Sequence, residues 1–97
     1  MSPQQLQLLI NSGMAWKLEG TVGRGCMAAI KSGACMLGLE SHTDFYGNRV
    51  PSRDEIMPGY MGTREFVVIV NGEDHAASLE LVPSEADADM LSTIFSY

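Results

Sequence analysis

Residues 66–82, FVVIVNGEDHAASLELV, decide the fold class that the sequence predicts. Residues 66–70 form a β-branched apolar run, which is typical of a strand. Asn71-Gly72 is a strongly preferred hairpin turn, and residues 75–82 would form the return strand. A two-residue turn at 71–72 and a four-residue loop at 71–74 both keep the leucines of the second strand on the apolar face of the first, so both registers stay open. The stretch predicts a β-hairpin and, with it, an α+β fold.

Helices are expected on both sides of this hairpin. A serine N-cap followed by proline predicts a first helix over Pro3–Glu19, and a glycine then ends it. A second helix follows from Thr21 to Gly33. The apolar run Ala34–Leu39 predicts a short buried strand, and Ser84 would cap a C-terminal helix whose acidic first turn suits the helix dipole.

Size and composition predict one domain over residues 1–97 that associates with itself. A chain of 97 residues has a small core, and its content of 45% hydrophobic and 19% charged residues is unusually poor in charge. We expect a homo-oligomer, most simply a two-fold dimer. The net charge of −6 comes from residues 71–97, which carry six acidic side chains and no Lys or Arg, so nucleic-acid binding is disfavoured.

The sequence contains no secretory signal pattern and no apolar run long enough to span a membrane, which predicts a cytoplasmic protein. Cys26 and Cys35 are then expected to be reduced core residues. Neither the cysteines nor His42, Asp44 and His75 have the spacing of a metal site, and we expect no metal and no cofactor.

Residues 40–62, ESHTDFYGNRVPSRDEIMPGYMG, are expected to form one long ordered recognition loop. Turn and capping signals explain much of it, and Phe45 is expected to anchor it to the core. The glycine-rich start of the second helix lacks the strand and lysine of a phosphate loop, so a tight helix–helix turn is the simpler interpretation. The side chains left over combine rings, cations and a histidine, a mixture suited to ligand binding. These predicted ligand-binding residues are Arg24, His42, Tyr46, Arg49, Arg53 and Tyr60.

The order of several short motifs between residues 10 and 65 is distinctive. They are WKLEG (16–20), Gly23-Arg24, Met27, Ser32-Gly33, His42-x-Asp44-x-Tyr46-Gly47-Asn48, VPSR (50–53) and Pro58-Gly59. In this order they resemble short uncharacterised proteins encoded by bacteriophages. The resemblance implies a setting, an accessory or counter-defence protein made in an infected bacterium, and it implies no catalytic residue.

Three classes of function are compatible with these features. The first is a non-enzymatic protein that binds a small anionic host ligand through the 40–62 loop. The second is an acidic inhibitor or adaptor of a host protein, which would use the charge of the last third of the chain. The third is a small hydrolase or isomerase working through His42 and Asp44, which would need a cleft where both side chains converge.

Overall fold

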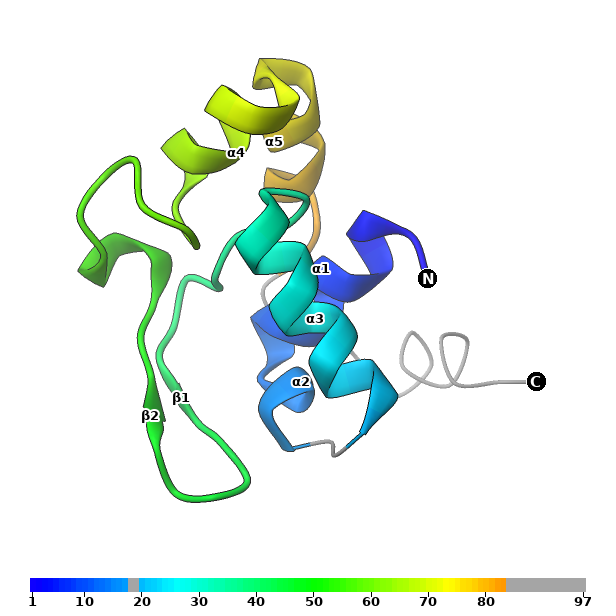
Figure 1. Cartoon of the computed structure of the whole chain (residues 1–97), viewed down its shortest axis with the longest axis vertical. Helices are drawn as coiled ribbons and strands as arrows, with labels where there is room; N and C mark the ends of the chain where they lie inside the picture. The colour runs from blue at the N-terminus through cyan, green and yellow to red at the C-terminus, as the bar shows by residue number, and fades with distance from the viewer. Residues whose placement is uncertain (18–19, 84–97) are drawn as a thin grey trace.

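A computed structural model describes residues 1–17 and 20–83 of the chain. Within these residues, helices surround a core and a two-stranded antiparallel sheet lies at one side (Figure 1), which confirms the α+β class. The elements in order are α1 (Pro3–Ser12), α2 (Met14–Lys17), α3 (Thr21–Ser32), β1 (His42–Thr43), β2 (Arg49–Val50), the 3-10 turn η1 (Arg53–Glu55), α4 (Arg64–Asn71) and α5 (Glu73–Glu80).

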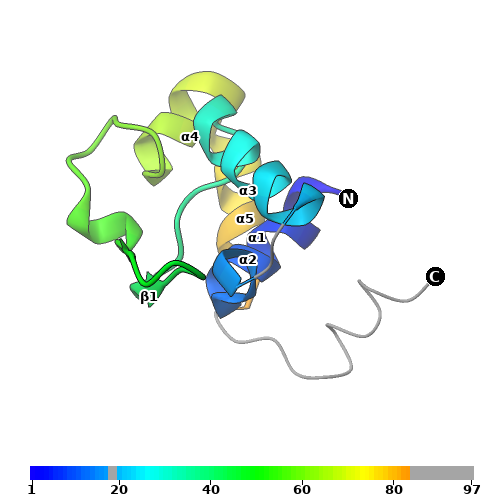
Figure 2. The same cartoon turned by 60° about the horizontal axis from the view of Figure 1, so that its bottom comes forward.

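The prediction of a β-hairpin over residues 66–82 is wrong. This stretch forms the two helices α4 and α5, which pack against each other at one end of the molecule (Figures 1 and 2). The antiparallel sheet lies instead inside the 40–62 segment, where His42 pairs with Val50 and Thr43 pairs with Arg49. The predicted C-terminal helix from Ser84 lies outside the described residues.

Capping and burial explain why residues 64–80 are helical. Thr63 lies before α4 and its side chain accepts a hydrogen bond from the Phe66 N–H at 3.2 Å. Gly72, at φ 92°, separates the two helices, and Glu73 and Asp74 then occupy the first turn of α5, where negative charge is favourable. A β-branched residue in a helix costs only about 0.5 kcal/mol relative to alanine, which the burial of an apolar face outweighs.

The first predicted helix, Pro3–Glu19, is interrupted. Gly13 adopts φ 82° and donates its N–H to Ile10 O at 3.2 Å, which ends α1 before the short helix α2 begins. A Cβ atom at Gly13 would lie 2.5 Å from His42 Nδ1, so the glycine also lets β1 approach α1. The second predicted helix is confirmed as α3, and Gly33 ends it at φ 80°.

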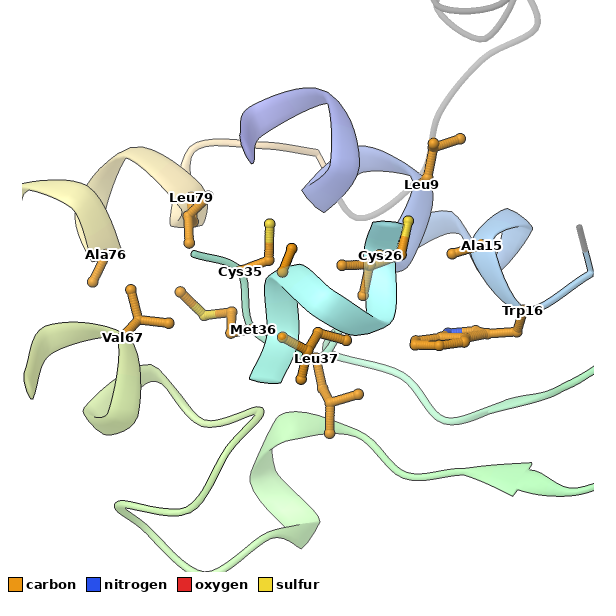
Figure 3. Packing of buried hydrophobic residues seen from close by; sticks show 13 residues of the cluster. Leu9, Ala15, Trp16, Cys26, Cys35, Met36, Leu37, Val67, Ala76 and Leu79 are labelled. Atoms are coloured by element: carbon orange, nitrogen blue, oxygen red, sulfur yellow. The ribbon is translucent and has the colours of Figure 1, made fainter. Parts of the chain in front are cut away.

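The core is one cluster of buried apolar side chains. It joins the helices that precede the small sheet in the chain to the helices that follow it. In Figure 3, Val67 of α4 and Ala76 and Leu79 of α5 lie at one end of the cluster, and Trp16 of α2 lies at the other. The two cysteines and Met36 fill the space between, which confirms the prediction that both thiols are core residues. No helix in the described part of the chain is long and apolar enough to cross a membrane.

The segment predicted as a strand, Ala34–Leu39, pairs with no strand among the described residues; residues 35–38 are buried, and Leu39 is exposed. Its central peptide groups are satisfied by a side chain instead. The fully buried Gln7 of α1 donates Nε2 to Met36 O at 2.8 Å and accepts the Met36 N–H on Oε1 at 2.9 Å. The same amide donates to Asn11 Oδ1 at 2.9 Å, and Asn11 in turn donates to Pro83 O at 2.9 Å. A buried polar network therefore ties α1 to the centre of the chain and to the residues after α5.

We expect Gln7→Ala to lower the free energy of unfolding by about 2–4 kcal/mol, because it leaves both the N–H and the C=O of Met36 buried without partners. Urea denaturation followed by circular dichroism measures this change. Gln4→Ala is the matched control, since Gln4 is exposed and its side chain forms, within the described residues, a single hydrogen bond, to Ser78 Oγ at 3.1 Å. Equal effects of the two substitutions would contradict the structural role of the Gln7–Met36 pair.

Candidate functional site

A groove of about 830 Å³ lies between α2, α3 and the tip of the β1–β2 hairpin. This volume is within the usual range of small-molecule sites. Two sides come from α2 and α3, which pack against each other, and the hairpin tip forms the third. Its lining residues are Ala15, Trp16, Gly20, Gly23, Arg24, Met27, Ala28, Lys31, Asp44, Phe45 and Tyr46.

One face of α3 forms the longest wall of this groove. The lining positions from Gly20 to Lys31 recur every three or four residues, which places them on one side of a helix. Gly20 and Gly23 carry no side chains, so this part of the wall is low. Arg24 and Lys31 are exposed cations, about 10 Å apart along the helix axis at the usual rise per residue. Within residues 1–17 and 20–83, neither of them forms an ion pair.

The hairpin tip is held in place by Asp44 and by α2. Asp44 Oδ1 accepts the N–H groups of Tyr46 at 2.9 Å and of Asn48 at 2.8 Å, so its carboxylate is engaged inside the turn. The Phe45 N–H donates to Trp16 O at 2.7 Å, which fixes the tip beside α2. These bonds order the backbone of the tip before any ligand is present.

The rings at this tip point away from the core. Phe45 is 60% exposed and Tyr46 is 78% exposed, and the two rings meet edge to face with centroids 5.3 Å apart. The prediction that Phe45 anchors the loop through its side chain is wrong, because its backbone N–H makes the anchoring contact. Two exposed rings on a fixed turn offer a surface on which a planar group can stack.

Of the six predicted ligand-binding residues, the structure brings Arg24 and Tyr46 together in this groove. His42 lies elsewhere, with Nε2 3.2 Å from Asn11 O and its ring over Gly13. Its contacts are with α1, so it links the sheet to the helices. Asp44 lines the groove but His42 does not, and the two side chains do not converge in a common cleft.

The other three predicted residues serve different parts of the molecule. Arg49 forms an ion pair with Glu55. Arg53 donates Nε to Leu37 O at 2.7 Å, and burial lowers the pKa of its guanidinium, an effect partly offset by Asp54 and Glu80. Tyr60 is 62% exposed on the loop before α4 and does not line the groove.

Trp16 and Lys31 were missed by the sequence analysis. Lys31 lies seven residues after Arg24, and this spacing on a predicted helix places two cations on one face, so the signal was present. Trp16 borders the groove because the hairpin tip lies beside α2, where the Phe45 N–H donates to Trp16 O, and this long-range contact has no sequence signature.

Within the described part of the chain, the groove has neither a reactive thiol nor a possible metal site beside it. Burial raises the pKa of Cys26 to about 11 and, with the charge of Cys26 adding to burial, that of Cys35 to about 12. Both thiols therefore stay protonated at neutral pH and are poor nucleophiles. Among the residues that the structure describes, no three His, Cys, Asp or Glu side chains are grouped so that they could hold a metal ion.

No protein-family model, curated protein or solved structure matches this chain.

The pair between Arg49 and Glu55 predicts a pH-dependent contribution to stability. Hydrogen bonds from the Ser52 N–H and from Arg49 lower the pKa of Glu55 from its ordinary value of 4.5 to about 2. Because the folded-state pKa is depressed, the stabilisation is complete above pH 4.5 and is lost as the pH falls towards 2. We expect Glu55→Gln to lower the melting temperature at neutral pH and to approach the wild type at acid pH.

Thermal melts at a series of pH values test this expectation. Glu40→Gln is the control, because Glu40 is exposed and forms no hydrogen bond within the described residues. If the melting temperature of Glu55→Gln differs from that of the wild type by the same amount at every pH, the charged interaction is ruled out.

Proposed function

We propose that the protein is a non-enzymatic binding protein that holds a small anionic ligand, with a planar ring, in the groove between α2, α3 and the hairpin tip. One observation carries this proposal: two cations without ion-pair partners in the described part of the chain face the same groove as two exposed rings. In the setting implied by the phage resemblance, the ligand would be a signalling molecule in the cytoplasm of the host bacterium.

The charges of the groove favour an anion. Arg24 and Lys31 contribute two positive charges, and Asp44, the one carboxylate among the described lining residues, already accepts two backbone N–H groups. A phosphate beside Arg24 would form charge-assisted hydrogen bonds, which are about twice as strong as neutral ones. An anionic group therefore fits this site better than a neutral or cationic one.

The rings set a second requirement. Phe45 and Tyr46 expose their edges and faces at the end of the groove formed by the hairpin tip, and Met27 adds a flexible apolar contact on α3. A flat base or similar ring would bury apolar surface there while its charged group extends along α3 towards the cations. A nucleotide has both parts, which makes nucleotides the first class to test.

The second and third functions have less support. Of the three acidic residues between 71 and 83, Glu73 and Glu80 both pair with Arg64, which reduces the charge that this part could offer to a basic host protein. A hydrolase or isomerase using His42 and Asp44 would need both groups free, and both are engaged in hydrogen bonds to the backbone.

Trp16 is the only tryptophan of the chain and lines the groove, so its fluorescence reports on ligand binding directly. We expect quenching by a purine nucleoside monophosphate or a purine cyclic dinucleotide. Arg24→Ala combined with Lys31→Ala should weaken that binding by about 10–100-fold, the usual effect of losing charged hydrogen bonds. Adenosine and inorganic phosphate, each titrated alone, separate the contributions of ring and anion.

Arg49→Ala is the control, since it also removes a positive charge, but at a residue of the 40–62 segment that does not line the groove. It should bind the same probe with unchanged affinity. If none of the four probes alters Trp16 fluorescence, or if Arg49→Ala weakens binding as much as the α3 double variant, the proposed site is wrong.

A further inference from the structure

We propose that a second surface of the protein, separate from the groove, forms the centre of a two-fold homodimer interface. This surface, the loop patch, consists of Leu39, Met57, Tyr60 and Met61. None of these residues lines the groove, so the proposal is independent of the ligand-binding function.

The loop patch exposes large apolar side chains that the core does not use. The exposed fractions are 53% for Leu39, 68% for Met57, 62% for Tyr60 and 51% for Met61. Leu39 lies beside the loop, because it lines the same hollow of about 270 Å³ as Ile56 and Pro58. In both views the segment between β2 and α4 runs outside the helices, so a partner can reach it (Figures 1 and 2).

The backbone beneath the loop patch is held in one conformation. Thr63 is 1% exposed, and its Oγ1 accepts the Gly59 N–H at 3.3 Å and donates to Tyr60 O at 2.7 Å. The Tyr60 N–H donates to Met57 O at 3.2 Å, and Gly62 O accepts the Leu37 N–H at 2.9 Å, which fixes the end of the loop to the core. A preordered loop loses little entropy on binding, and exposed aromatic and methionine side chains on such a loop are typical of interface hot spots.

The area of the loop patch is similar to the apolar part of a standard dimer interface. At about 200 Å² for a fully exposed large side chain, the four residues offer on the order of 450 Å² per copy. A standard interface buries about 800 Å² per partner, of which somewhat more than half is apolar. The loop patch would therefore supply the apolar centre, and surrounding polar residues would supply the rim.

The charges beside the loop patch favour a second copy over a partner of one charge. The hollow next to it is lined by Arg53 and Arg64 together with Asp54, Glu65 and Glu80, so both signs are present at short range. Arg64 already pairs with Glu80 within one copy, so the charges around the hollow nearly cancel and a second copy that meets them is repelled little. A strongly acidic or strongly basic partner would meet like charges on the same rim.

Sedimentation velocity of the full-length chain, from about 1 to about 100 μM, tests the proposal. We expect a reversible dimer for the wild type. Tyr60→Lys, and separately Met61→Glu, should weaken dimerisation by at least about 100-fold, because each substitution enters a two-fold interface twice. Far-ultraviolet circular dichroism and melting temperatures close to the wild type establish that both variants are folded.

Ile69→Lys is the matched control, because Ile69 is 73% exposed on α4 and is not part of the loop patch. This variant should dimerise like the wild type. A wild-type chain that stays monomeric at the highest concentration overturns the proposal, as does a dimer that survives both loop-patch substitutions. A dimer that Ile69→Lys disrupts while Tyr60→Lys leaves it intact places the interface on α4 and also overturns it.

Discussion

The hydrogen-bonded pair between the Gln7 side chain and the Met36 peptide is the constraint on which the rest of the structure depends. The extended segment around Met36 runs through the core without a neighbouring strand, and an unpaired buried peptide group is costly. Gln7 substitutes for a strand because its carboxamide offers Met36 an N–H donor and a carbonyl acceptor side by side, and its second N–H donates to Asn11. The fold can thus bury an extended segment among helices.

The same need for partners explains how the long segment after residue 39 is positioned. Leu37 O accepts from the Arg53 side chain, Gly38 O accepts the Arg53 N–H at 2.9 Å, and the Leu37 N–H donates to Gly62 O. The buried segment is therefore satisfied on one side by α1 and on the other by residues that follow the small sheet. Arg53, whose chemistry suggested a ligand, instead completes the hydrogen bonds of the core. This contact fixes the Arg53 side chain beside the extended segment and outside the groove.

Local signals explain which parts of the fold could be predicted from the sequence. The start of α1, the glycine cap of α3 and the turn at Ser52–Glu55 follow from capping chemistry that acts within a few residues. The stretch 66–82 could not be predicted because its β-branched run and its Asn-Gly dipeptide both favour a hairpin locally. The competing signals, Thr63 as N-cap and the acidic pair after Gly72, are equally local, and they agree with the burial of Val67 and Leu79 in the cluster that contains Met36. That contact joins residues far apart in the chain, so no short window contains it.

For the candidate site as well, the residue composition indicated which segment to examine, but it did not predict where the side chains of that segment lie. Composition indicated the 40–62 segment, but the structure divides that segment into two surfaces with different chemistry. In Figure 1 the hairpin tip lies at the bottom beside α2, whereas the chain before α4 lies at the upper left. The tip carries rings beside the cations of α3, and the chain before α4 carries apolar side chains beside charges of both signs.

Because the two surfaces are separate, a dimer formed through the loop patch would leave the groove of each copy open. The proposed dimer would therefore be compatible with the proposed ligand binding, and the small core of each copy would gain stability from its partner without covering the groove.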